Sequence, residues 1–347
     1  MKLIFTKIFA FSSIALLMLA SCKKDETKVV AGKGTKVALT ATASTIVLSS
    51  ANAGDNAISF KYTPSDYGFK AAVSYTLQID VKGNNFANSK DVSISGLSKI
   101  YTGGGLNTLL LSMGLIAGNP AQLETRVKSE LAANVETTYS NVLTITVTPY
   151  FDIPVYPSLY VPGAYQGWSP ATAEKIASPA DNKIYEGYVN FSDAGSLEFK
   201  YTSDPDWTHT NYGDGGGGVL NTTGGNLKVP STGYFLLKGN LNDNTWSATK
   251  TQWGIIGDAT PKGWDASTAL TYDATSKVWA GVVHLTAGGA CKFRANDAWD
   301  LNLGDNKPAN GVLKYGGENI PVTVAGDYKV TLNLSHAGYY YYNLLKQ

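Results

Sequence analysis

Two similar sets of residues recur in the C-terminal half of the chain, and both suit carbohydrate recognition. Each set has two tryptophans, a basic residue and an asparagine, in segments rich in Gly, Asp and Asn. An indole face receives the C–H face of a pyranose ring, while basic and amide side chains bond its hydroxyls. We therefore predict two sugar sites, formed by Trp168, Lys200, Trp207 and Asn211 in the first set and by Trp264, Arg294, Trp299 and Asn302 in the second.

The alternative for each tryptophan is a structural role. A tryptophan in a β-sandwich often packs in the core or at its rim, so YQGW and PKGW could be hydrophobic plugs that stabilise turns. A role in ligand binding is favoured because the tryptophans lie in loops and recur in both copies together with a basic residue. Because adjacent residues of a strand face opposite sides, a buried Phe199 would turn Lys200 outward.

Catalytic and metal chemistry find little support among the titratable residues. The three histidines, His209, His284 and His336, fall on positions that do not recur. Cys291 aligns with Leu197 inside a strand, which is typical of a small buried hydrophobe. Asp residues beside Gly and Asn commonly form turns. We expect no catalytic residue, no metal site and no cofactor.

Composition indicates a β-rich protein with little net charge. The chain has 347 residues, 44% of them hydrophobic, with 36 Gly and 21 Tyr. Its 28 basic and 27 acidic residues give a net charge of +1, which argues against nucleic acid as a partner.

The C-terminal half contains an internal repeat, which predicts two copies of one fold. Residues 182–201 align without a gap on residues 276–295, an offset of 94 from Lys183 to Lys277. The aligned pairs are Tyr185 with Trp279, Gly187 with Gly281, Phe199 with Phe293, Lys200 with Arg294, Tyr234 with Tyr328 and Trp246 with Tyr340.

Alternating apolar residues predict an all-β chain of three tandem β-sandwiches. Residues 37–150 form an immunoglobulin- or fibronectin-like spacer, the N-terminal domain, in which Leu106, Leu109, Leu110 and Met113 predict a short helix. Residues 151–251 and 252–347 form two carbohydrate-binding modules, module 1 and module 2. The segment FDIPVYPSLYVP serves as a stiff connector into module 1.

The first 21 residues have the pattern of a lipoprotein signal peptide. Lys2 and Lys7 precede an apolar run that ends Leu-Ala-Ser before Cys22. We expect lipidation of Cys22 and a flexible tether over residues 22–36. The Lys-Lys-Asp-Glu after Cys22 is similar to an export tag for the outer face of the outer membrane.

Together these features resemble the SusE/SusF-like surface glycan-binding lipoproteins, and the two modules resemble SusE more closely. The resemblance implies a glycan bound on two aromatic residues beside a base, at the two sets of residues named above. It implies an outer-membrane lipoprotein that binds starch or another α-glucan and holds it for a SusC/SusD-like uptake system; contact with that transport complex is left open. Lys200 lacks the bidentate fork of Arg294, so module 1 is expected to bind more weakly or differently.

Three other functions remain. The protein could bind a different glycan. It could be an adhesion protein that binds a protein through the Tyr339–Tyr342 run, although packing within a strand explains that run as well. It could be a glycoside hydrolase, which would require paired carboxylates at set separations.

Overall fold

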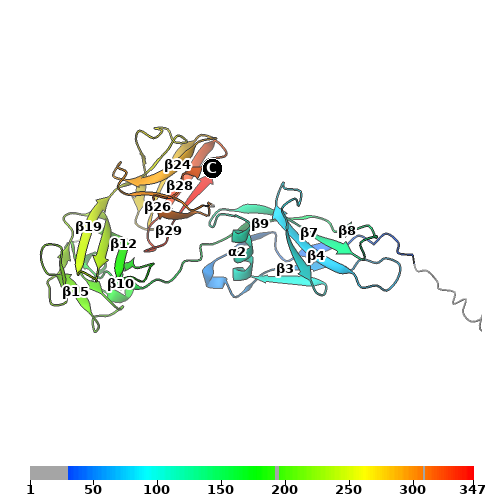
Figure 1. Cartoon of the computed structure of the whole chain (residues 1–347), viewed down its shortest axis with the longest axis horizontal. Coiled ribbons are helices and arrows are strands. Elements are labelled where there is room, and N and C mark those ends of the chain that lie inside the picture. The colour runs from blue at the N-terminus through cyan, green and yellow to red at the C-terminus, as the bar shows by residue number, and fades with distance from the viewer. Residues whose placement is uncertain (1–29, 192–194, 308) are drawn as a thin grey trace, which may run out of the picture.

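The computed structural model describes residues 30–191, 195–307 and 309–347. The predicted signal peptide, Cys22 and the start of the tether lie outside the described residues. The regular secondary structure of the described chain is mostly β-strand, which confirms the predicted fold class. Figure 1 shows the N-terminal domain extended to one side, with the two C-terminal bodies packed against each other.

The N-terminal domain is a sandwich of two sheets, β1-β3-β6 and β2-β9-β7-β4-β5, with β8 paired to β7. The predicted helix is confirmed as α2 (Gly103–Ser112), whose Leu106 and Leu110 are buried against this core. The strands are β1 (Leu39–Ala41), β2 (Thr45–Val47), β3 (Asn56–Tyr62), β4 (Ser74–Val81), β5 (Lys90–Ile94), β6 (Ser98–Thr102), β7 (Ala121–Glu130), β8 (Thr138–Tyr139) and β9 (Leu143–Thr148).

Module 1 has an eight-stranded sheet, β16-β15-β14-β10-β11-β12-β18-β19, and a small sheet of β13 and β17. Its ends approach each other, because Val219 bridges to Thr245. The strands are β10 (Ser158–Tyr160), β11 (Lys175–Ala177), β12 (Ile184–Phe191), β13 (Glu198–Phe199), β14 (Tyr201–Thr202), β15 (Asn211–Asp214), β16 (Leu220–Asn221), β17 (Leu227–Lys228), β18 (Gly233–Asn240) and β19 (Thr245–Thr251).

Module 2 forms a sheet in the order β21-β20-β24-β25-β26-β29-β28-β23-β22, with β27 paired to β24. Its end strands β21 and β22 are separated by Leu270 alone, so the sheet curls back on itself. The strands are β20 (Trp253–Ile256), β21 (Thr268–Ala269), β22 (Thr271–Asp273), β23 (Val278–Leu285), β24 (Ala290–Ala295), β25 (Asn302–Asp305), β26 (Val312–Tyr315), β27 (Ile320–Pro321), β28 (Gly326–Asn333) and β29 (Tyr340–Lys346).

The strand pairings support the offset of 94 for β12 and β23. Lys183 and Lys277 both adopt left-handed backbone, with φ of 63° and 56°, just before these strands. The predicted match of the terminal strands is wrong. Phe191 pairs with Gly233 and Leu285 with Gly326, so Phe235, not Tyr234, matches Tyr328, and Trp246 matches Tyr342, not Tyr340.

The match between Lys200 and Arg294 is also wrong. Asn211 and Asn302 begin the matching strands NYGD and NLGD, and they pair with Thr202 and Arg294 respectively. Arg294 therefore takes the place of Thr202, and Lys200 corresponds to Lys292. By the same register, Phe199 pairs with Leu227 and Cys291 with Ile320, so Phe199 corresponds to Cys291.

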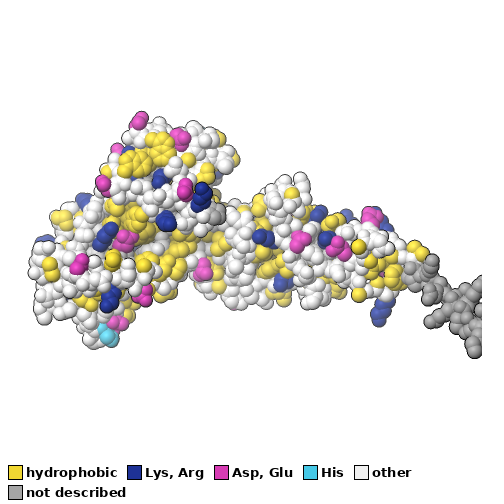
Figure 2. All heavy atoms as spheres, in the orientation of Figure 1, with side chains coloured by type: hydrophobic (Ala, Val, Ile, Leu, Met, Phe, Trp, Pro, Cys, Tyr) yellow, Lys and Arg dark blue, Asp and Glu magenta, His cyan; other side chains and the backbone are white. Residues whose placement is uncertain are grey.

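An aromatic contact joins the two modules. Tyr188, Tyr234 and Leu236, on β12 and β18 of module 1, are buried in one hydrophobic cluster with the core of module 2. The Tyr188 ring lies 5.9 Å from Trp253, and its hydroxyl is 2.9 Å from the Tyr315 hydroxyl. Hydrophobic side chains gather where the two bodies meet, while charges of both signs scatter over the rest of the visible face (Figure 2).

The matching face of module 2 is different. Val282, which corresponds to Tyr188, is 69% exposed. Asp327 and Lys329, which correspond to Tyr234 and Leu236, are also exposed. The outer face of this sheet is thus apolar in module 1, where a neighbour covers it, and open to solvent in module 2.

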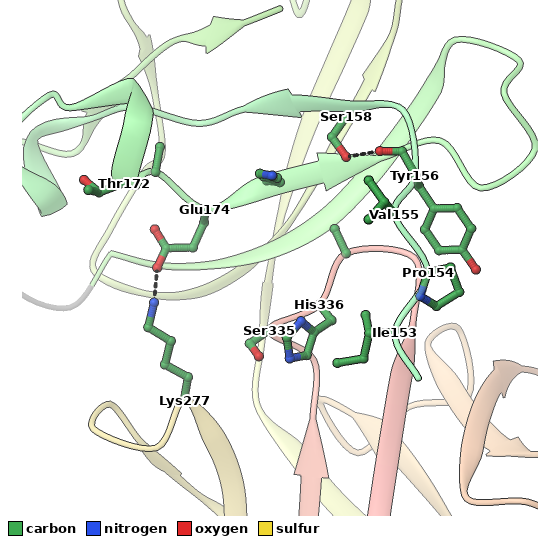
Figure 3. Close-up of a pocket in the computed structure, with 13 residues that line it drawn as sticks. Ile153, Pro154, Val155, Tyr156, Ser158, Thr172, Glu174, Lys277, Ser335 and His336 are labelled. Carbon is green, nitrogen blue, oxygen red and sulfur yellow. Dashed lines mark hydrogen bonds and ion pairs between the residues drawn. The ribbon is translucent and has the colours of Figure 1, made fainter. Parts of the chain in front are cut away.

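A second contact between the two modules lies beside the connector. Figure 3 shows the Lys277 ammonium of module 2 bonded to Glu174 of module 1, at 2.9 Å between Nζ and Oε1. His336, in the turn between β28 and β29, lies in the same cleft, which has a volume of about 330 Å³ and faces the connector at Ile153 and Pro154. The connector also contacts module 2 through Phe151, which stacks on Tyr341 at 4.1 Å between ring centroids.

Candidate functional site

Trp168 and Trp207 form an aromatic pair at the surface of module 1. Their ring centroids are 6.3 Å apart and their planes are inclined by 40°. Trp207 is 41% exposed and Trp168 is half-buried. Trp168 follows Gly167, and both adopt left-handed backbone, with φ of 60° and 77°. The Trp207 indole N–H donates to the Trp168 carbonyl at 3.2 Å, which ties the two loops together.

The pair opens onto a shallow cavity of about 450 Å³ lined by Trp168, Lys200, Trp207 and Asn226. Lys200 donates to the carbonyls of Gly224 and Gly225, at 2.8 and 3.1 Å. Its ammonium is therefore at the cavity but already bonded in part. Three of the predicted residues meet here.

Asn211 does not line the cavity but bonds the backbone of a residue that does. Its side-chain amide donates to the Trp207 carbonyl at 3.1 Å. Asn302 does the same in module 2, where it donates to the Trp299 carbonyl at 2.8 Å. These two asparagines therefore hold the backbone of the second tryptophan in each module.

Asn226 was missed by the sequence reasoning. It lines the module 1 cavity and bonds Glu198 at 3.0 Å. Since Leu227 corresponds to Ile320, Asn226 corresponds to Asn319, which is exposed. A signal was present in the sequence, because an asparagine follows a Gly-Gly pair directly in module 1 and after one intervening residue, Glu318, in module 2.

Trp264 and Trp299 repeat the aromatic pair in module 2. Their centroids are 6.1 Å apart, their planes are inclined by 32°, and they are 36% and 48% exposed. The two pairs thus share spacing, inclination and exposure, although the loops that carry them differ in length. We call them the module 1 platform and the module 2 platform.

Arg294 lies beneath the module 2 platform and does not face solvent. Its side chain is 4% exposed, and its guanidinium carbon is 4.8 Å from the centre of the Trp299 ring. The guanidinium donates to Ser267 Oγ at 2.8 Å and to the Asp297 carboxylate. An outward orientation of the base is therefore wrong for Arg294, which braces Trp299 by a cation–π contact.

Two aspartates stabilise the loops. The pKa of Asp297 is lowered to about 2 by the backbone N–H and side chain of Ser267 and by Arg294. The pKa of Asp206 is lowered to about 2, mainly by its hydrogen bond with His209, whose own pKa is raised in return. Both carboxylates are charged at neutral pH and serve as fixed acceptors.

The remaining reactive groups lie elsewhere. The described residues contain no cluster of three or more His, Cys, Asp or Glu side chains that could hold a metal ion. Cys291 is buried, and burial raises the pKa of its thiol to about 12. Within the described parts of the chain, no helix has the length and apolar character needed to cross a membrane.

Comparison with known proteins supports the resemblance. Residues 24–128 match the family model described as SusE outer membrane protein, so the chain is SusE-like over most of its N-terminal domain. The crystal structure of SusF from Bacteroides thetaiotaomicron is similar at 19% sequence identity, over 90% of this chain and 77% of that one. The TM-score of that comparison is 0.24, which carries no argument about fold or function. No curated protein sequence matched the chain.

Proposed function

We propose that this chain is a non-catalytic protein of the cell surface that binds a polysaccharide through its two C-terminal modules. The observation that carries the proposal is the pair of matching platforms. Two indoles about 6 Å apart, with a moderate inclination, recur in both modules; three of the four are exposed and Trp168 is half-buried. Neutral sugar rings suit such surfaces, because rigid rings lose little entropy when a ligand packs on them.

The glycan that we favour is starch or a related α-glucan. The match to the SusE family supports this choice, and a curved glucan chain suits two inclined aromatic planes. A different glycan is the alternative. Binding to a protein partner is less favoured, because Tyr340 and Tyr342 of the tyrosine run are buried inside module 2.

The domain arrangement gives each part a role within this proposal. Cys22 carries a lipid anchor in the outer membrane, residues 22–36 form a tether, and the N-terminal domain, residues 37–150, holds the modules away from the membrane. The bound glycan would be retained for a SusC/SusD-like uptake system. Two sites on one polymer would bind about tenfold or more tightly than one site alone.

Isothermal titration with maltoheptaose tests the proposal. We expect a dissociation constant of roughly 0.1–1 mM for each site. Replacing Trp168 and Trp207 by Ala should remove one site, and replacing Trp264 and Trp299 the other. Trp246→Phe, at a tryptophan that packs on Phe199 away from both platforms, is the control. Binding that survives loss of all four platform tryptophans would refute the site, and release of reducing ends from starch would refute the non-catalytic role.

A further inference from the structure

A cavity of about 280 Å³ lies between module 1 and the loop that carries Trp299. One wall comes from β18 and β19 of module 1, and the other from residues 295–301 of module 2. Its volume is near the lower end of the range for small-molecule sites. The lining residues that matter here are Leu236, Lys238, Thr249, Asn296, Asp300 and Leu301.

The loop on the module 2 side is fastened to module 1. The Asn296 side-chain amide donates to the Lys250 carbonyl of module 1 at 2.8 Å, and the N–H of Gln252, the first residue of module 2, donates to Asn296 Oδ1 at 2.8 Å. Asn296 and Asp297 both adopt left-handed backbone, with φ of 55° and 54°. Such backbone persists where surrounding bonds hold it, so the cavity has a fixed wall.

The polar groups at the cavity suit a neutral polyol. Lys238, Thr249 and Asp300 are exposed. Within the described residues, the Thr249 hydroxyl and the Asp300 carboxylate make no hydrogen bond, and the Lys238 ammonium makes only an ion pair with Glu186, at 3.6 Å. One cation, one anion and a hydroxyl can bond several sugar hydroxyls with no net charge.

The cavity also has an apolar part and a position next to the platform. Leu236 is buried and Leu301 packs against the same cluster, which gives a surface for sugar C–H groups. Ala298 and Asp300, the neighbours of Trp299 on either side, line the cavity. The matching loop of module 1, residues 203–210, makes its described hydrogen bonds within module 1.

We propose that this cavity is an additional sugar subsite, built jointly by the two modules. It takes a further unit of the glycan whose neighbouring units lie on the module 2 platform. Among the described residues, the matching loop of module 1 makes no hydrogen bond to another module. The inference rests on the proposed function, since it names how far the glycan extends at the second site.

The test compares ligand lengths in a full chain that carries Trp168→Ala and Trp207→Ala, so that only module 2 binds. Titration with maltose, maltotetraose and maltoheptaose should show affinity that rises with length. Lys238→Ala and Asp300→Ala should each weaken maltoheptaose about fivefold or more, as expected for a lost bond to a charged group, and leave maltose unchanged. Lys228→Ala, at an exposed lysine of β17, is the control.

The outcomes separate the two ideas. Equal maltoheptaose affinity in parent and both variants would overturn the subsite and leave the proposed function standing. Equal weakening of maltose and maltoheptaose would also overturn it, because the residues would then act on the platform itself. If the unmutated chain bound none of the three oligosaccharides, both the proposed function and the subsite would be refuted. Melting temperatures that match the parent show that the variants fold.

Discussion

The carboxylate of Asp297 joins the two loops of the module 2 platform, because one of its oxygens accepts both the Ser267 backbone N–H and the buried Arg294 guanidinium. Ser267 follows Trp264 in one loop, and Arg294 lies under Trp299 of the other. In module 1 the two platform loops are linked directly, because the Trp207 indole N–H donates to the Trp168 carbonyl. The same spacing of indoles is thus held by two unrelated sets of bonds.

Asp297→Ala should weaken binding at module 2 and leave module 1 unchanged. Without the shared acceptor, Arg294 keeps a buried charge with fewer partners and the two loops lose their link. We expect an affinity for maltoheptaose about tenfold lower in the chain with Trp168→Ala and Trp207→Ala. The matched control is Asp273→Ala, at the end of β22, where the carboxylate accepts the Thr275 N–H. An unchanged affinity in Asp297→Ala would contradict the role of the Asp297 carboxylate in joining the two loops.

Binding at module 2 should be lost at low pH through the same carboxylate. The folded pKa of Asp297, about 2, lies below its ordinary value of 3.8, so the charged form is favoured in the folded loop. Its stabilising effect is therefore complete above pH 3.8 and disappears as pH falls toward 2. Titrations at successive pH values should show this loss, and Asp297→Asn should lack it. A loss centred near pH 6 would point to another group.

Asn226→Ala should weaken module 1 by a few-fold, because its amide lines the cavity beside both indoles. The change is measured with Trp264→Ala and Trp299→Ala present, so that module 1 alone binds. Asn242→Ala, at an exposed amide of another turn, is the control. The corresponding Asn319→Ala should affect module 2 only, and an effect on both modules would indicate a general loss of structure.

Tyr188→Ala should destabilise the protein by about 3–5 kcal/mol, the usual cost of truncating a buried aromatic side chain. Val282→Ala changes the corresponding position of module 2, where the side chain is 69% exposed, and should cost under about 0.5 kcal/mol. Denaturant unfolding monitored by tryptophan fluorescence measures both. Similar values for the two variants would show that the contact between the modules contributes little.

The thiol of Cys291 should resist alkylation in the folded protein. It is buried, and its raised pKa, about 12, leaves almost no thiolate at neutral pH. Peptide mass spectrometry after iodoacetamide treatment should find it unmodified in buffer and modified in denaturant. Rapid modification in buffer would mean that β24 opens frequently.

The strands and the helix of the N-terminal domain followed from the sequence, because alternation and the spacing of Leu106 and Leu110 are local signals. The paired tryptophans were also visible, because all four sit in polar loops and the first of each pair, Trp168 or Trp264, follows a glycine. These features do not require knowledge of which strands pair.

The register of the repeat required the structure. Both modules contain a phenylalanine followed by a base, Phe199-Lys200 and Phe293-Arg294, and these dipeptides align without a gap. Strand pairing shows that they are two residues out of step, since Asn211 faces Thr202 and Asn302 faces Arg294. The buried position of Arg294 was hidden for the same reason, because the loops that cover it are set by tertiary contacts.

The buried Tyr188 and the exposed Val282 show that the two modules differ on the same face of the sheet, so their order along the chain matters. Module 1 without its neighbour would present Tyr188, Tyr234 and Leu236 to water, an adhesive patch prone to association. Module 2 has the charged side chains of Asp327 and Lys329 on the same face, which suits a surface that faces solvent. The two units are therefore not interchangeable building blocks: reversing their order would bury charges at the junction and leave the aromatic surface uncovered at the tip.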